Sequence, residues 1–249
     1  MFQKVILFLS FLFIPFSRVS VDTMAVPASD SPTPVSELAA GEQLFEEMEL
    51  GGIVNFIAFR QAVAGYNRIK EKSKPILTLI DFSKPSTEKR FFVFDMEKKQ
   101  LLYSSVVSHG RNSGENYATS FSNQNGSYKS SLGFYLTENT YQGGNGYSLI
   151  LNGLEKGIND KAKERSIVVH GASYANPTVA ASGRLGRSLG CPALPTKLAK
   201  PIINTIKDGS VMFIYANNSS YLAQSDILKN VSAPIPPSEN NPFTEKLST

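Results

Sequence analysis

The sequence pattern changes at Pro75, and this change limits the folds that the chain can adopt. From there on, short runs of β-branched and aromatic residues are separated by turn residues, which is typical of β-strands. Helical spacing returns only after Pro195, with apolar residues from Leu198 to Ile206 on one face. We therefore predict a mainly β fold with helices (α+β), in which a sandwich or barrel carries one packed helix. The predicted strands are Arg90–Phe94, Leu101–Val107, Gly133–Thr137, Tyr147–Leu151, Ser166–His170 and Val211–Tyr215.

The segments around this β-rich body have compositions of their own. A nearly unbroken apolar stretch over 5–16 follows Lys4, which is the pattern of a signal peptide. The stretch is shorter than the ~20 residues that a membrane-spanning helix needs, so we expect export and no stable membrane span after cleavage. We predict the following divisions: a signal peptide over 1–20 with cleavage as late as residue 28, a linker over 21–35, a helical N-terminal region over 36–74, the main domain over 75–222 and a flexible tail over 223–249.

The composition excludes several classes of function. The chain has 1 cysteine and 2 histidines, so it forms no disulfide within itself and holds no clustered cysteine metal site. The formal net charge is only +4, and no run of basic residues interleaved with aromatic ones is present. Both observations argue against a nucleic-acid partner, which would need an electrostatic footprint. A base that titrates near neutral pH can only be His109 or His170.

Cys191 and His170 are the residues best suited to chemistry. Cys191 lies between Gly190 and Pro192, which favours a rigid turn that presents one side chain. His170 ends a predicted strand and precedes a long glycine-containing loop over 171–190. A free thiol is mostly protonated at neutral pH, so a cysteine nucleophile needs a base or a positive field beside it. We predict that Cys191 is a nucleophile and that His170 is its general base.

Two other interpretations of these residues stay open at the level of sequence. In the first, Cys191 is a buried spectator and His170 is a hydrogen-bonded residue at the end of a strand. In the second, Cys191, His109 and His170 are zinc ligands, although their separations match none of the usual ligand spacings. The nucleophile hypothesis is favoured because an unpaired cysteine in an exported protein is uncommon.

A resemblance to a known family supports that choice. His170-Gly171, a loop and Ser188-Leu189-Gly190-Cys191 together resemble the catalytic signature of the L,D-transpeptidases. The run from Ser130 to Tyr135 is similar to the strand entry of that family, and the stretch over 75–221 resembles its murein L,D-transpeptidase catalytic-domain branch. The chain departs from the common signature at two positions, where it has Leu189 in place of a histidine and Ala193 in place of asparagine or arginine.

The resemblance implies acyl transfer on peptidoglycan stem peptides in the bacterial periplasm or cell envelope, without a metal or a cofactor. Cys191 would form a thioester on a stem tetrapeptide and release D-alanine, and an amine acceptor would then resolve the thioester. Water as the acceptor would make the protein an L,D-carboxypeptidase, and a non-catalytic cell-wall-binding module is the alternative from another class.

The remaining candidate site residues lie near Cys191 in the sequence or on a second polar loop over 108–131. Backbone donors for the developing oxyanion are expected at Gly190 and Leu189. Arg184 and Arg187 could bind the carboxylates of a stem peptide, since guanidinium pairs with such groups in a bidentate manner. His109 either lines the cleft or is hydrogen-bonded in its turn without a chemical role. Ser188 and Tyr174 are further candidates for the cleft.

Overall fold

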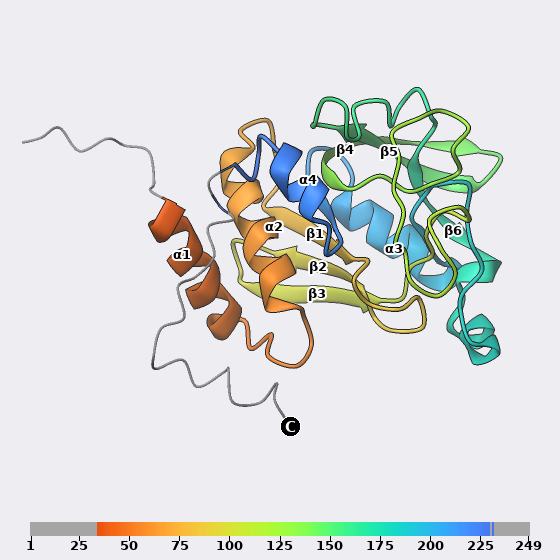
Figure 1. Cartoon of the computed structure of the whole chain (residues 1–249). Coiled ribbons are helices and arrows are strands. Elements are labelled where there is room, and N and C mark those ends of the chain that lie inside the picture. Colours follow the sequence, from red (N-terminus) through yellow and green to blue (C-terminus); the bar gives the residue numbers. More distant parts are fainter. Residues whose placement is uncertain (1–33, 230, 232–249) are drawn as a thin grey trace, which may run out of the picture. The chain divides into compact units, whose positions relative to one another are not determined.

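A computed structural model describes residues 34–229 and 231, and the fold is mainly β with helices, as predicted (Figure 1). The predicted signal peptide over 1–20 and most of the predicted linker lie outside the described residues. None of the described helices is both long enough and apolar enough to cross a membrane. The elements in chain order are α1 (Pro34–Glu47), α2 (Phe56–Arg68), β1 (Ile76–Asp81), β2 (Phe91–Asp95), β3 (Gln100–Ser105), β4 (Gly133–Gly143), β5 (Gly146–Gly153), β6 (Val168–Ala172), η1 (Ser173–Ala175), η2 (Pro177–Ser182), β7 (Ala193–Pro195), α3 (Thr196–Ile206), β8 (Val211–Tyr215) and α4 (Ser219–Gln224).

The eight strands form one sheet that nearly closes on itself. Their order is β3-β2-β1-β8-β4-β5-β6-β7, and the pairs β1–β8 and β6–β7 are parallel. The chain that leaves the edge strand β3 reaches the other edge, because Ser108 bridges Ala193 in β7 and Gly110 bridges Ser188. These two bridges join the ends of the sheet beside the segment that carries Cys191.

Helix α2 covers one face of the sheet at the end opposite to β6 (Figure 1). Asn55 caps the helix, since its side-chain oxygen accepts hydrogen bonds from the backbone N–H groups of Ile57 and Ala58. Gly65 allows close contact with the sheet, because a Cβ there would lie 2.0 Å from the ring of Phe134. The apolar side chains of α2, among them Phe59, Val63 and Tyr66, are therefore part of the core that the helix shares with the strands.

Helix α3 covers the other face, beneath β6. Strand residues alternate between the two faces of a sheet, and the α3 face is marked by Gly171, where a Cβ would lie 2.9 Å from the Cβ of Ala199. His170 is the neighbour of Gly171 and therefore points away from α3. The face opposite to α3 is thus the one that carries His170.

The structure differs from the predictions at several boundaries. Strands β1 and β7 were not predicted, and the helical region extends from α1 through α2 into the same hydrophobic core as the sheet. The predicted flexible tail begins too early, because Leu228 and Val231 are buried in that core. Ser225 and Tyr221 both donate hydrogen bonds to the buried carboxylate of Glu155, which ties this segment down. The rest of the predicted tail, 232–249, lies outside the described residues.

Candidate active site

The parallel pairing of β6 and β7 brings Cys191 and His170 to one face of the sheet. His170 pairs with Ala193, so the same register continued back by two residues places Cys191 beside Val168. The backbone N–H of Val168 indeed donates a hydrogen bond to Cys191 Sγ at 3.5 Å. Paired residues share a face, and diagonal neighbours across two strands lie about 7–8 Å apart, within reach of an aromatic ring. The extended register would make Cys191 and His170 neighbours of this kind, although Cys191 itself lies before β7.

A rigid turn presents Cys191 from the end of the long loop over 171–190. Gly190 has a φ of 128°, a backbone conformation that would be strained in any residue with a side chain. The Ser188 hydroxyl donates to the carbonyl of Cys191 at 2.6 Å and accepts from the N–H of Gly190 at 3.1 Å. The Ser130 hydroxyl donates to the carbonyl of Gly190 at 3.0 Å. Ser188 is therefore a buried part of the turn, and the N–H of Gly190 is already engaged.

The thiol of Cys191 is mostly enclosed, with the residue 8% exposed. Its Sγ–H donates to the carbonyl of Ser166 at 3.6 Å. Burial raises the pKa of the thiol above its ordinary value, whereas the Val168 N–H and the guanidinium of Arg165 oppose that rise. Cys191 is therefore a thiol at rest, and a base would be needed to make it a thiolate.

His170 is arranged to be such a base. Its Nδ1 lies 3.1 Å from the carbonyl oxygen of its neighbour Gly171, which can only accept a hydrogen bond. Nδ1 must then carry the proton, so that Nε2 holds the free lone pair of a neutral ring. Burial lowers the pKa of His170 below its ordinary value of 6.5. At neutral pH the site thus contains a neutral imidazole and a neutral thiol.

His109 occupies a different environment from the one expected of a cleft residue. It is 1% exposed, and Arg90, which is fully buried, donates from its guanidinium to His109 Nδ1 at 2.8 Å. The other ring nitrogen, Nε2, contacts the carbonyl of Gly114 at 3.3 Å. Burial and the charge of Arg90 lower the pKa of His109 to about 4. The ring is therefore neutral and hydrogen-bonded on both sides, and its position gives no support to a contact with substrate.

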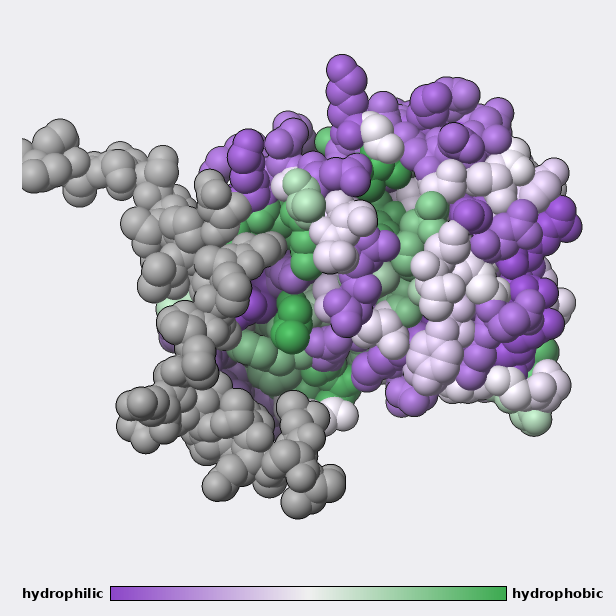
Figure 2. Space-filling view, viewed as in Figure 1, coloured by the Kyte–Doolittle hydropathy of each residue, from purple (hydrophilic) through white to green (hydrophobic). Residues whose placement is uncertain are grey.

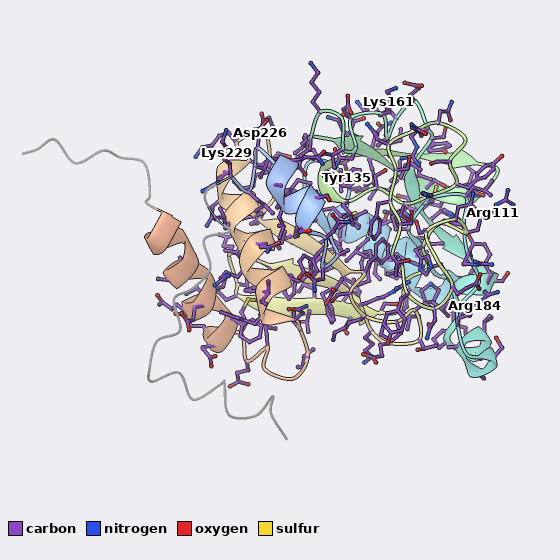
Figure 3. All side chains as sticks on the ribbon, viewed as in Figure 1. Arg111, Tyr135, Lys161, Arg184, Asp226 and Lys229 are labelled. Atoms are coloured by element: carbon purple, nitrogen blue, oxygen red, sulfur yellow. The ribbon has the colours of Figure 1, made fainter. Side chains whose placement is uncertain are left out.

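Arg184 and Arg187 connect the two long loops (Figure 3, where Arg184 and Arg111 lie at the same end as β6). Both guanidinium groups pair with Glu115, from Arg184 Nε at 2.9 Å and from Arg187 Nη1 at 2.6 Å. Arg187 also donates to the carbonyls of Arg111 and Gly114. Glu115 therefore already occupies part of the donor set of both arginines, and a carboxylate of a substrate would share each guanidinium with it or displace it.

Tyr174 and Leu189 both lie beside the nucleophile. Burial and the negative charge of a Cys191 thiolate raise the pKa of the half-buried Tyr174 to about 12, so its phenol stays protonated. Leu189 is 58% exposed, next to the buried turn formed by Ser188 and Gly190. Figure 2 shows hydrophilic and near-neutral residues over much of the face that it draws.

Arg165 is the site residue that the sequence analysis missed. Its guanidinium donates to the carbonyls of Ser122 and Lys129 at 2.7 and 2.6 Å and also to the hydroxyl of Ser131. A Cβ at Gly190 would lie 3.5 Å from Arg165 Nη2, so the cation is adjacent to the turn that carries the nucleophile. Its one sequence signal is its place directly before the strand that was predicted over Ser166–His170. Arg165 therefore fixes the segment 122–131 and contributes positive charge near the thiol.

A metal site is not formed by the residues suggested as zinc ligands. Within 34–229 and 231, no three His, Cys, Asp or Glu side chains are grouped as a metal ion would require. His109 contacts Arg90, a cation, instead of a second ligand. The polar groups around Cys191 are hydrogen-bond partners of a thiol and of its turn.

Comparisons with known proteins point to one family. Residues 52–215 match the family model described as the L,D-transpeptidase catalytic domain. Among curated proteins, none matches the sequence significantly. One similar solved structure is L,D-transpeptidase 3 from Mycobacterium tuberculosis, with 13% identity and a TM-score of 0.36 over 57% of this chain and 61% of that one. Another is an L,D-transpeptidase from Mycobacterium smegmatis, with 12% identity and a TM-score of 0.35 over 57% of this chain and 59% of that one. A third is an L,D-transpeptidase from Stackebrandtia nassauensis, with 14% identity and a TM-score of 0.34 over 74% of this chain and 80% of that one. The chain thus spans about three fifths of the length of the mycobacterial proteins.

Proposed function

The chain belongs to the L,D-transpeptidase catalytic domain family, and from this premise we propose that it is a cysteine acyltransferase that cross-links peptidoglycan stem peptides. The observation that carries the proposal is the shared sheet face of Cys191 and His170, with the thiol held by the Val168 N–H. The contact of His170 Nδ1 with the Gly171 carbonyl supports the tautomer that this role requires. This arrangement provides a nucleophile, a base and a group that orients the base.

In the first step, Cys191 Sγ attacks the carbonyl carbon of the third residue of a stem tetrapeptide. Nε2 of His170 takes the proton from the thiol as the C–S bond forms. The same imidazolium then gives that proton to the amine of D-alanine as the C–N bond breaks. The products of this step are a thioester on Cys191, free D-alanine and a neutral His170, so both the proton and the charge balance.

In the second step, an amine of a neighbouring stem attacks the thioester and His170 again carries the proton. The result is a new amide cross-link and a restored thiol. Water in place of the amine would release a tripeptide, which is the L,D-carboxypeptidase alternative. The enclosure of the thiol, with Cys191 8% exposed, favours an acceptor that is bound over one that diffuses in.

Charge on the tetrahedral intermediate needs backbone donors that are not already used. The N–H of Gly190 donates to Ser188, so it is engaged in holding the turn. Within the described part of the chain, no acceptor for the N–H of Leu189 is found, and the N–H of Cys191 already faces its own sulfur and favours the thiolate. We assign the oxyanion donors to Leu189 and Cys191, in place of the pair Leu189 and Gly190.

The substrate places the reaction outside the cytoplasmic membrane. Peptidoglycan stem peptides are found there, and the apolar stretch over 5–16 has the pattern of a signal peptide. Export and removal of the leader are therefore part of the proposal.

A product analysis tests this function. The mature protein and its Cys191→Ala variant are incubated with tetrapeptide muropeptides, and the products are identified by mass spectrometry. We expect loss of D-alanine and formation of dimers with the native protein only. Tripeptide monomers alone would support the carboxypeptidase, and unchanged products from the variant would exclude Cys191 as the nucleophile. Binding to sacculi without any turnover would identify a wall-binding module.

A further inference from the structure

Arg111 differs from the other arginines beside the active-site turn because its donors are unused. Arg184 and Arg187 both pair with Glu115. Arg111 is exposed, and within the part of the chain that the structure describes its guanidinium forms no hydrogen bond or ion pair. The cation lies 4.2 Å from the centroid of the Tyr128 ring. The N–H donors of Arg111 are therefore available to an anionic ligand.

The backbone of Arg111 is attached to the turn that presents Cys191. The N–H of Arg111 donates to the carbonyl of Ser188 at 2.8 Å. One residue earlier, a Cβ at Gly110 would lie 3.0 Å from the Cα of Gly190. Consecutive Cα atoms are about 3.8 Å apart, so the Cα atoms of Arg111 and Cys191 are at most about 12 Å apart. A long side chain at position 111 can thus reach a ligand bound beside the sulfur.

Tyr128 provides the surface on which the guanidinium lies. Its φ is 53°, a left-handed conformation that is an outlier for a bulky residue. Asn112 holds it there, because its N–H donates to the carbonyl of Tyr128 at 3.2 Å and its side-chain amide donates to the carbonyl of Ser127 at 2.9 Å. Strained residues of this kind gather at ligand-binding sites. Tyr128 is 37% exposed, so its ring steadies the cation at the surface of the protein, where a ligand can reach it.

We propose that Arg111, supported by Tyr128, binds the terminal carboxylate of the D-alanine that Cys191 releases. This inference rests on the proposed function, which supplies the leaving group. One nitrogen and one Cα separate the carboxylate carbon from the attacked carbonyl carbon, so these two carbons lie within about 4 Å of each other. A guanidinium binds a carboxylate through two parallel hydrogen bonds, which fix its orientation as well as its position. The scissile amide is thereby held in place for the sulfur.

The contact acts on binding and not on the chemical step. The carboxylate carries the same charge in the bound peptide, in the tetrahedral intermediate and in free D-alanine, and it lies outside the bonds that change. An interaction that is equally strong in the ground state and in the transition state lowers KM and leaves kcat unchanged. Arg111 therefore sets the affinity for the donor peptide, whereas His170 sets the rate.

Turnover of two donor peptides tests the inference. One is a tetrapeptide that ends in D-alanine, and the other is the same peptide ending in D-alaninamide, which has no terminal charge. We expect the native protein to show a KM about tenfold lower for the acid. Arg111→Gln should raise the KM of the acid about tenfold and leave the KM of the amide and both kcat values unchanged. A preference that survives Arg111→Gln, or an equal loss of activity on both peptides, would overturn the inference.

Two further variants assign the effect to residues. Tyr128→Leu should weaken the preference for the acid without removing it, because the cation loses the ring but keeps its charge. Lys161→Gln is the matched control, since it removes one exposed positive charge that lies apart from Arg111 in Figure 3. A preference that Lys161→Gln removes equally, or one that Tyr128→Leu leaves unchanged, would contradict the assignment. Thermal unfolding shows that each variant is folded.

Calorimetry with the Cys191→Ala protein separates this inference from the proposed function, because binding needs no turnover. The acid should bind about tenfold more tightly than the amide. If the two bind equally while the native protein releases D-alanine, the function stands and the carboxylate site is wrong. If the acid binds selectively but the native protein turns neither peptide over, the site stands and the proposed reaction is wrong. No binding of either peptide would overturn the inference.

Discussion

The two histidines of this chain occupy local sequences of the same kind but have opposite environments. His109 and His170 each precede a glycine where an extended segment meets a long loop. Arg90 binds the ring of His109 at Nδ1 and the Gly114 carbonyl lies at Nε2, whereas His170 is bonded only at Nδ1, within the described residues. His109 is thus part of the interior, and His170 retains a nitrogen that can accept a proton.

The difference shows what makes a histidine a base in this fold. Burial lowers the pKa of both rings, so both are neutral at neutral pH. Only the free Nε2 of His170 lies on the sheet face of a thiol. Hydrogen-bond partners, and not the local sequence, therefore distinguish His109 from His170, to which we assign the catalytic role.

The largest expected effect comes from replacing the two histidines by glutamine in turn. His170→Gln should lower kcat/KM by about 10³-fold, because general-base catalysis contributes on that scale. His109→Gln should keep most of the activity, since an amide can accept from Arg90 and donate to the Gly114 carbonyl. Steady-state release of D-alanine measures both variants, and thermal unfolding shows that each is folded.

The pH profile of the native enzyme sharpens this result. Activity needs the neutral imidazole, so it should rise as pH increases through the pKa of His170, with a midpoint below 6.5. A midpoint above 6.5, or a larger loss in His109→Gln than in His170→Gln, would contradict the assigned roles.

The second-largest expected effect is a dependence of the free energy of unfolding on pH. The pKa of His109 is about 4 in the folded protein and 6.5 in the unfolded chain, so the unfolded state binds the proton more tightly. The free energy of unfolding should therefore fall as pH decreases from 6.5 to 4, by about 3 kcal/mol from this residue. Urea denaturation at pH 7 and at pH 4.5 measures the loss, which should be smaller in His109→Gln. An equal loss in both proteins would place the titration elsewhere, for example at His170.

A third, smaller effect is expected from Arg165. Loss of its positive charge in Arg165→Gln should raise the pKa of Cys191 further and slow alkylation at neutral pH by about tenfold. The rate of reaction with iodoacetamide as a function of pH measures the shift. Arg184→Gln is the matched control, because Arg184 bonds to Glu115 on the surface and is not among the causes of the Cys191 shift. Superimposable profiles for Arg165→Gln and the native protein would exclude Arg165 as the source of positive field.

The smallest effect should come from the surface ion pairs that Glu115 forms with Arg184 and Arg187. Glu115 is 70% exposed although two arginines pair with it, and exposed ion pairs stabilise little. Glu115→Gln should change the free energy of unfolding by less than about 1 kcal/mol. Thermal unfolding and kcat/KM together measure the result. A loss of kcat/KM as large as that of His170→Gln would mean that the ion pairs of Glu115 with Arg184 and Arg187 organise the site.

Much of the fold could be predicted from the sequence where an element carries a helical apolar stripe or a run of β-branched and aromatic residues bounded by turn residues. Helix α2 and helix α3 show their apolar stripes, and the hairpin of β2 and β3 is marked by the charged turn between them. Strand β1 was not predicted, although β2 and β8, whose residues are likewise all buried, were recognised from their β-branched and aromatic runs. It lies between β2 and β8 in the middle of the sheet, a position that only the assembled fold defines.

The site was predictable to the extent that its residues carry unusual chemistry. Cys191 and His170 stand out as a single thiol and one of only two histidines. The orienting group of His170 is a backbone carbonyl, which has no sequence signal. Arg165 was missed for a related reason, because its role depends on how the segment 122–131 folds over it.

Trapping of the acyl-enzyme tests the central claim most directly. The native protein, Cys191→Ala and His170→Gln are each mixed with a tetrapeptide, quenched in acid within the first turnover and analysed by intact-mass and peptide-mapping mass spectrometry. The account predicts a tripeptidyl adduct on Cys191 of the native protein, formed far more slowly in His170→Gln and absent from Cys191→Ala. Release of D-alanine without any adduct on Cys191, or an adduct that forms at the native rate in His170→Gln, would contradict it.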